Sequence, residues 1–220
     1  MKIVCIIYVL ISGIFASGQI DGILEYYQEL ELKHKNNPGA ISFIKENQGL
    51  IANYDSLYQI ILIRHGEPKL DKSGWRSRKG AMSFIQAYDS AGVYAPSFLP
   101  VRLEESEVNA IYTSSLNRSI STAEQLYPQF FEKKEKRLFR EFERKIVKFY
   151  NLKLPLDLWL KASRVFWYAG LNDKGIESVS KAKRRALKGA EFLEDNAIQE
   201  GKSLLVSHGF LNRFIVKNLE

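Results

Sequence analysis

Cysteine is the scarcest reactive residue in this chain of 220 residues, which contains only one, Cys5. Cys5 lies in an N-terminal segment that we expect to be removed, so the mature chain would have no cysteine. That absence excludes disulfides, a thiol nucleophile and thiolate metal sites. A cysteine-free domain also suits an oxidising compartment.

Apolar runs long enough to cross a membrane are missing as well. The longest run extends from Ile3 to about Phe15, whereas a membrane span needs about 20 apolar residues. Lys2 precedes the run, and the small residues Ala16-Ser17-Gly18 follow it. This order of charge, apolar stretch and small residues is typical of a secretory signal peptide. We therefore predict a signal peptide over residues 1–18 and a periplasmic or secreted protein, with a membrane partner only if the segment is uncleaved.

Internal repeats and low-complexity segments are absent, and the composition is that of an ordinary globular domain. The net charge of +7 favours anionic partners. The basic residues gather over Lys133 to Lys148 and Lys181 to Lys188, and we interpret most of them as solvated helix faces. Because no recognised nucleic-acid motif accompanies this charge, we expect no nucleic-acid partner.

Residues 19–55 are predicted to form an N-terminal helical extension without a chemical motif. Ile20 to Lys33 and Ala40 to Ile51 have helical spacing, and Asn36-Asn37-Pro38-Gly39 separates them as a breaker. The polar surroundings of His34 indicate an exposed side chain without a function.

Residues 56–220 alternate between short apolar runs and longer amphipathic stretches. Strands are predicted at Tyr58 to Ile63, Val108 to Tyr112 and Ser203 to Val206. Helices are predicted at Arg78 to Ser90, Leu116 to Tyr127, Pro155 to Tyr168 and Ile176 to Gln199. Strands that alternate with helices indicate an α/β domain with a mainly parallel sheet.

Polar residues follow each predicted strand, at the edge where α/β sheets bind ligands. The first strand leads into Arg64-His65-Gly66-Glu67, and the last leads into Ser207-His208-Gly209. The middle strand leads into Thr113-Ser114-Ser115-Leu116-Asn117-Arg118. Two histidines and two arginines should therefore meet at one rim and bind an anion there. We expect the glycines to let the backbone turn and approach a ligand, with the amides of the following helix favouring the anion.

This set of side chains suits phosphoryl transfer. Arginine matches the oxygens of a phosphoryl group in a bidentate manner, and neutral histidine is a nucleophile that forms a phosphohistidine. The leaving oxygen needs a proton, so a carboxylic acid should lie nearby. A metal ion is not expected, because both histidines are grouped with arginines whose charges repel a divalent cation.

The three motifs, in this order, resemble those of the histidine phosphatase superfamily (the phosphoglycerate mutase-like family). The segment from Thr113 to Ala123 is similar to its second motif, and the resemblance extends from about Tyr58 to the C-terminus. It implies a three-layer α/β sandwich and a reaction without metal or organic cofactor.

The resemblance also implies the roles of individual residues. His65 would accept the phosphoryl group, and Arg64, Arg118 and His208 would bind it. The acid of the family lies between the second and third motifs, where Glu141 is our candidate and Glu143 the reserve.

The chain departs from the family pattern in three places, one of which is the stretch after Glu141, where the usual Gly-Trp-Glu-Gly-like sequence is missing. The Trp-Asn pair that follows the first motif in mutase members is replaced here by a stretch containing Lys69, Lys72 and Arg76, which we interpret as a solvated loop. The family adds a strand after the late histidine, whereas only residues 209–220 follow here, so either this sequence ends early or the sheet lacks its last strand.

The sequence thus predicts a phosphomonoester hydrolase that acts outside the cytosol on a phosphorylated small molecule or a phosphoprotein. Two alternatives remain open: a phosphoglycerate mutase-like phosphotransferase, and a catalytically weak phosphate-binding module.

Overall fold

The computed structural model describes residues 4–9, 58–95, 103, 108–130, 132–149 and 152–219. The two helices predicted in the N-terminal extension, and His34 with them, lie outside the described residues. Within the described ranges, no helix is both long enough and apolar enough to cross a membrane.

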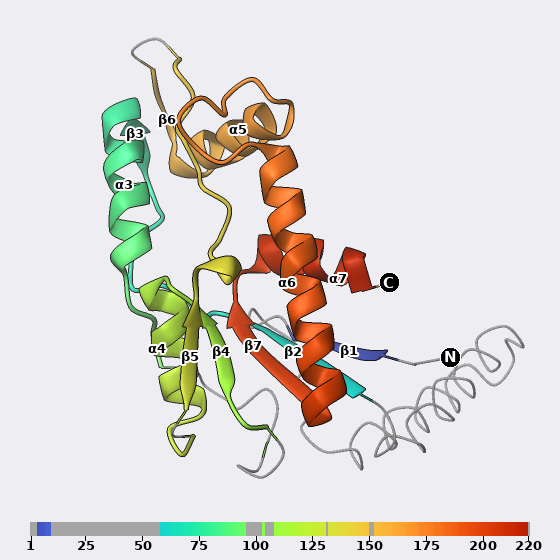
Figure 1. Ribbon diagram of the computed structural model, residues 1–220. Coiled ribbons are helices and arrows are strands. Elements are labelled where there is room, and N and C mark those ends of the chain that lie inside the picture. The colour runs from blue at the N-terminus through green and yellow to red at the C-terminus, as the bar shows by residue number, and fades with distance from the viewer. Residues whose placement is uncertain are drawn as a thin grey trace, which may run out of the picture.

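A parallel sheet of five strands forms the centre of the domain (Figure 1). Its strands, in spatial order, are β1 (Val4–Val9), β2 (Tyr58–Arg64), β7 (Lys202–Ser207), β4 (Ile111–Ser114) and β5 (Lys133–Lys136). The β7 strand lies between β2 and β4, so the three strands whose ends carry the motifs are direct neighbours. The predicted α/β class and parallel sheet are confirmed.

Helices cover both faces of the sheet, as the alternation of strand side chains requires. Ile60, Leu62 and Leu205 face α6 (Val179–Glu200) and α7 (Gly209–Leu219). Ile61, Ile63, Leu204 and Val206 face the other way, against α4 (Asn117–Leu126). Each such buried side chain contributes about 1.5–3 kcal/mol. The result is the expected three-layer sandwich.

A second group of elements covers the carboxyl edge of the sheet (Figure 1). It consists of α3 (Arg78–Ser90), α5 (Leu156–Tyr168) and a small antiparallel pair, β3 (Trp75–Ser77) with β6 (Lys153–Pro155). Ala81, Phe84, Leu156 and the fully buried Trp159 form its apolar core. The predicted helix over Pro155 to Tyr168 therefore forms as α5 and packs with α3 in this group.

The sheet edge beside β2 is occupied by residues that the sequence assigns to a signal peptide. The β1 strand runs parallel to β2, with Cys5 opposite Gln59 and Val9 opposite Ile63. The signal peptide over residues 1–18 stays a prediction, because pairing in the sheet and removal on export are alternative fates of one segment. At the C-terminal end, the described residues after β7 form α7 and no further strand, as expected for a sheet without the additional strand.

Two predictions about secondary structure are wrong. The segment Lys133 to Lys148 is not a helix: it contains β5, the 3-10 turn η3 (Arg137–Phe139), and no helix or strand over 140–149. Four charged residues build β5, which leaves a polar outer edge that discourages pairing with another chain. The middle strand was expected at Val108 to Tyr112 but forms at Ile111–Ser114, so that Ser114 ends it.

Candidate active site

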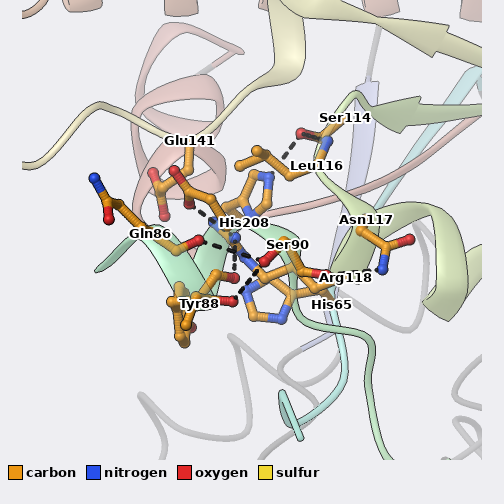
Figure 2. A network of polar contacts seen from close by, with 12 residues as sticks. His65, Gln86, Tyr88, Ser90, Ser114, Leu116, Asn117, Arg118, Glu141 and His208 are labelled. Carbon is orange, nitrogen blue, oxygen red and sulfur yellow. Dashed lines mark hydrogen bonds and ion pairs between the residues drawn. The ribbon is translucent and has the colours of Figure 1, made fainter. Parts of the chain in front are cut away.

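Three neighbouring strand ends place the two motif histidines side by side (Figure 2). Arg64 lies opposite Ser207 in the register of β2 and β7, and the backbone N–H of His65 donates to the Ser207 carbonyl at 2.8 Å. The imidazole rings of His65 and His208 meet edge to face, with their centroids 5.1 Å apart. The parallel sheet therefore fixes the pair through backbone hydrogen bonds.

The His65 ring has a defined tautomer. Its Nδ1 donates to the Gly66 carbonyl at 2.7 Å, and because a carbonyl only accepts, Nδ1 carries the proton. Burial lowers the pKa of His65 to about 3, assisted by the nearby charges of Arg118, Arg64 and Lys72. The ring is therefore neutral at ordinary pH, and Nε2 holds a lone pair suited to nucleophilic attack.

His208 lies behind His65 and is fully buried. Its Nε2 lies 2.8 Å from the Ser114 hydroxyl, and its buried Nδ1 has no hydrogen-bond partner among the described residues. Burial, followed by the charge of Arg118, holds the pKa of His208 well below its usual range. Two neutral imidazoles are thus in contact, with His65 lining the site and His208 buried behind it.

Arg118 is held from three sides and is only 1% exposed. It donates through Nη1 to the Tyr88 carbonyl at 3.0 Å and to the Asp89 carboxylate at 3.1 Å. Its guanidinium also lies 4.5 Å from the centre of the Tyr88 ring. Asp89 therefore takes up one of the hydrogen-bond donors of Arg118 in this structure.

The glycines of the motifs act differently from our expectation. Neither Gly66 nor Gly209 has a positive φ, so neither provides a special turn. A Cβ atom at Gly209 would lie 3.0 Å from the Arg64 Cδ, which shows that the close approach is to the Arg64 side chain. Helix α7 does begin at Gly209, but no helix begins at Gly66, where a loop follows instead.

Thr122 connects the first two motifs. The Gly66 N–H donates to its hydroxyl at 2.9 Å, and the hydroxyl donates to the Arg118 carbonyl at 2.6 Å. This chain of hydrogen bonds fixes the loop after His65 relative to the arginine.

A cavity of about 540 Å³ opens in front of His65. Its charged lining consists of the basic residues Arg64, Lys72, Arg118, Arg140, Arg144, Arg164 and Arg213, and the acidic residues Asp89, Glu141 and Glu143. Its apolar lining includes Phe84, Ile85, Tyr88, Leu116, Phe142, Leu160, Ile176 and Phe210. The excess of positive charge suits an anionic ligand, and the volume is in the range of small-molecule sites, which is about 300–1,000 Å³.

The predicted site residues therefore come together. Arg64, His65, Arg118 and both candidate acids line the cavity, while His208 lies directly beneath His65. Lys72, which we interpreted as part of a solvated loop, also lines it and pairs with Glu67 at 3.5 Å.

The two candidate acids are held differently. The Glu143 carboxylate accepts the backbone N–H of Glu177 at 2.8 Å, which ties it to the approach to α6. Glu141 is half-buried and accepts only the N–H of its neighbour Phe142, at 3.0 Å. Figure 2 places Glu141 on the same side of the histidines as Tyr88. Its geometry makes Glu141 the better candidate.

Sequence reasoning missed several residues of the cavity, above all Asp89, Arg144 and Arg164. Asp89 lies near the end of an amphipathic helix and has no motif around it, Arg144 belongs to a segment rich in charge, and Arg164 lies in the aromatic helix α5. Only the fold reveals that these segments turn toward His65. As for metals, no group of three His, Cys, Asp or Glu side chains that could hold an ion occurs within the described part of the chain.

The fold and the cavity define an α/β protein with a histidine–arginine pocket at the carboxyl edge of a parallel sheet. The chain also matches the sequence profile of the histidine phosphatase superfamily (branch 1) over residues 60–220. It therefore belongs to that superfamily. No curated protein matches the chain.

Solved structures of similar shape are distant in sequence. One is the product of open reading frame Rv3214 from Mycobacterium tuberculosis, at 16% identity and a TM-score of 0.46, over 72% of this chain and 77% of that one. A second is Bacillus stearothermophilus YhfR, at 22% identity and a TM-score of 0.42, over 73% and 76% of the two chains. A third is a phosphoserine phosphatase from Entamoeba histolytica, solved with 3-phosphoglyceric acid, at 15% identity and a TM-score of 0.43, over 72% and 78%.

Proposed function

We propose that this protein is a phosphomonoester hydrolase that acts through a phosphohistidine on His65. The observation that carries the proposal is the state of the His65 ring, which is neutral, with Nδ1 bonded to the Gly66 carbonyl and Nε2 left as the nucleophile. It faces a cavity with Arg64 and Arg118, whose guanidinium groups are suited to phosphoryl oxygens.

The reaction has two steps. In the first, the Nε2 lone pair of His65 forms a bond to phosphorus, and the ester P–O bond breaks with its electron pair on the leaving oxygen. Glu141 gives that oxygen a proton, so an alcohol departs. In the second, water attacks phosphorus, Glu141 accepts its proton, and the N–P electron pair returns to Nε2. Inorganic phosphate is released, and the neutral ring is restored.

The arginines and His208 would stabilise the charge on the transferring group. Arg64 and Arg118 compensate the negative oxygens in both steps, and preorganised charges of this kind are the largest contribution in phosphoryl transfer. His208 is fully buried and does not line the cavity, so we propose that its unpartnered Nδ1 meets a phosphoryl oxygen only after the ring moves toward the bound group. The partner of the protein is therefore a phosphorylated small molecule or a phosphoprotein.

The decisive experiment measures hydrolysis of phenyl phosphate by the full chain, with and without EDTA, beside His65→Ala. We expect turnover that survives EDTA, is lost in His65→Ala, and is accompanied by an acid-labile phosphoenzyme in rapid-quench samples. Transfer of phosphate to an acceptor alcohol faster than to water would favour the phosphotransferase alternative. A folded protein that binds phosphate without turnover between about pH 4 and 8 would instead be a binding module.

We also propose that the protein acts outside the cytosol, on the basis of the first 18 residues. The test is the mass of the protein recovered after expression of the full gene in a bacterium that secretes proteins. A chain that begins near Gln19 in the periplasm or medium supports export. A cytosolic chain that retains residues 4–9 supports their role as strand β1.

A further inference from the structure

Helix α5 carries apolar side chains on two opposite faces. Its inner face packs into the protein through the buried Trp159 and Trp167. Its outer face is formed by exposed side chains that recur at helical spacing, and the loop after the helix extends it: Leu158, Val165, Tyr168 and Leu171. Val165 is 66% exposed and Leu171 is 73% exposed. Surface helices usually turn charged residues outward, so an apolar outer face of this kind indicates an interaction surface.

Basic residues surround the outer face. Residues 156–185, which form α5, the following loop and the start of α6, contain seven Lys or Arg but only three Asp or Glu. Two of these acids are paired, Asp157 with Lys161 and Glu177 with Arg185, and the third is half-buried. Four basic residues are exposed and form no ion pair with other described residues: Lys174, Lys181, Lys183 and Arg184. This basic cluster gives the surface an excess of positive charge.

The outer face and the basic cluster are held together. The Lys183 ammonium lies 5.8 Å from the centre of the Tyr168 ring. The Leu171 N–H donates to the Phe166 carbonyl at 2.9 Å, which folds the loop back onto the end of α5. The indole N–H of Trp167 donates to the carbonyl of Glu177 at 2.7 Å, which fixes the approach to α6 against α5. The apolar and the basic side chains therefore belong to one surface.

An anionic lipid surface matches these features better than a second copy of the chain does. A twofold interface centred on the outer face would bring two basic clusters together, and like charges repel. The headgroups of an anionic bilayer would instead neutralise the cluster. Figure 1 shows α5 at the end of the molecule away from the central sheet, where a bilayer can reach it. Apolar side chains on such a helix enter the interface of a bilayer, and tyrosine is favoured at the depth of the headgroups.

We propose that the outer face of α5 and the basic cluster bind the surface of an anionic lipid bilayer. The helix lies in the plane of the interface, with its exposed apolar side chains below the headgroups and the basic cluster at the phosphates. This peripheral binding requires neither the N-terminal segment nor the proposed hydrolysis. Because α5 also lines the cavity through Leu160 and Arg164, it would hold the proposed active site beside the membrane.

The test measures co-sedimentation of the full chain with vesicles. The probes are vesicles of phosphatidylcholine with about one quarter phosphatidylglycerol, beside vesicles of phosphatidylcholine alone. We expect the chain to bind the anionic vesicles and to bind the neutral ones at least about tenfold more weakly. Combining Leu158→Ser with Val165→Ser should weaken binding to the anionic vesicles at least about tenfold, because two apolar side chains no longer leave water. Both positions are exposed, so the fold should tolerate the changes.

Tyr168→Ser and Tyr94→Ser are a matched pair, since the two side chains are 55% and 56% exposed. Tyr94 lies beyond the C-terminal end of α3, where its N–H donates to the Glu67 carbonyl at 2.9 Å. Tyr168→Ser should weaken binding to the anionic vesicles at least about threefold, because the ring leaves the interface. Tyr94→Ser should leave the affinity within about twofold of wild type.

The contribution of charge is tested in the same assay. Lys183→Gln with Arg184→Gln should weaken binding to the anionic vesicles at least about tenfold. Lys79→Gln with Lys217→Gln is the control, because it removes the same charge from exposed positions on α3 and α7. This control should weaken binding about threefold at most, since net charge alone acts weakly at physiological salt.

An indole placed on the outer face distinguishes this binding from attachment by the apolar run of residues 3–15. Trp75→Phe removes the one exposed indole among the three tryptophans, because Trp159 and Trp167 are buried. In that background, Val165→Trp should give fluorescence that shifts to shorter wavelength on anionic vesicles and is quenched by brominated lipid. Tyr94→Trp in the same background should give neither change.

Three results would overturn the proposal. The first is that the full chain does not bind the anionic vesicles. The second is binding that Leu158→Ser with Val165→Ser leaves unchanged, which would assign it to the N-terminal run. The third is a dimer in sedimentation velocity that this double variant dissociates, without lipid binding, which would assign the outer face to a second copy. None of these measurements depends on turnover, so this proposal and the proposed function stand or fail separately.

Discussion

Gly209 determines how close the Arg64 side chain can lie to the start of α7. An added Cβ atom would lie 3.0 Å from Arg64 Cδ and 3.1 Å from its Nε, which is tighter than most real Cβ contacts, so the Arg64 side chain would have to give by a few tenths of an ångström. The Arg64 side chain would have to move, and with it the charge that faces His65. The missing side chain at Gly209 thus leaves the space in which the Arg64 side chain lies.

We therefore expect Gly209→Ala to lower kcat/KM for phenyl phosphate by about tenfold to a hundredfold, because small displacements of a binding group are costly. The thermal midpoint should hardly change, since alanine is the better helix former. Gly66→Ala is the control: its Cβ would meet Val93 at an ordinary 3.5 Å, so activity should stay within about threefold. Equal losses in the two variants would contradict this explanation.

At the scale of elements, Arg185 connects α6 to the segment that carries Glu141. It donates to both carboxylate oxygens of Glu177, at 2.8 and 2.6 Å, and to the carbonyls of Leu138 and Arg140, at 2.8 and 2.6 Å. Both side chains of the ion pair are largely buried. Arg185 thus ties a long helix to η3 and to the start of the segment without helix or strand, whose later residues are held by Arg164 of α5.

Replacing Arg185 with methionine should lower the free energy of unfolding by about 3 kcal/mol, because the Glu177 carboxylate loses its partner in a buried place. Urea denaturation measures this. Arg184→Met, one residue away and exposed, should change stability by about 0.5 kcal/mol or less. Similar losses of unfolding free energy in the two variants would show that the contacts of Arg185 do not stabilise the fold.

The elements with a strong apolar period were predictable, and the polar ones were not. The Ile-rich run of β2 and the amphipathic run of α3 predict their elements directly, down to the bounds of α3. By contrast, β5 is built from charged residues and gains its place by pairing with β4, which no local pattern reveals.

Among site residues, His65, His208, Arg64 and Arg118 lie at or just after strand ends and could be found. Arg144 and Asp89 reach the cavity only through tertiary packing.

For the whole molecule, two buried neutral histidines make stability depend on pH. The pKa of His65 is about 3 in the folded state and 6.5 when solvated, so the unfolded chain binds more protons between these values. Stability from this group is complete above about pH 6.5 and is lost progressively as the pH falls toward 3. His208 acts in the same direction.

We expect the wild type to lose about 2 kcal/mol more stability than His65→Asn between pH 7 and pH 4.5, since asparagine does not titrate but retains a donor for the Gly66 carbonyl. Urea titrations at a series of pH values measure the difference. Parallel curves for the two proteins would mean that His65 is already protonated, or solvated, in the native state.

The central place of β7 governs when the molecule can fold. This strand separates β2 from β4, yet it is made more than a hundred residues after β2. While a ribosome is synthesising the chain, neither of the two earlier strands has its inner neighbour until residues 202–207 have emerged. The sheet, and the pairing of His65 with His208 at its rim, must therefore form late in synthesis or after it. The strand order thus delays completion of the site, and not only of the sheet, until residues 202–208 have been synthesised.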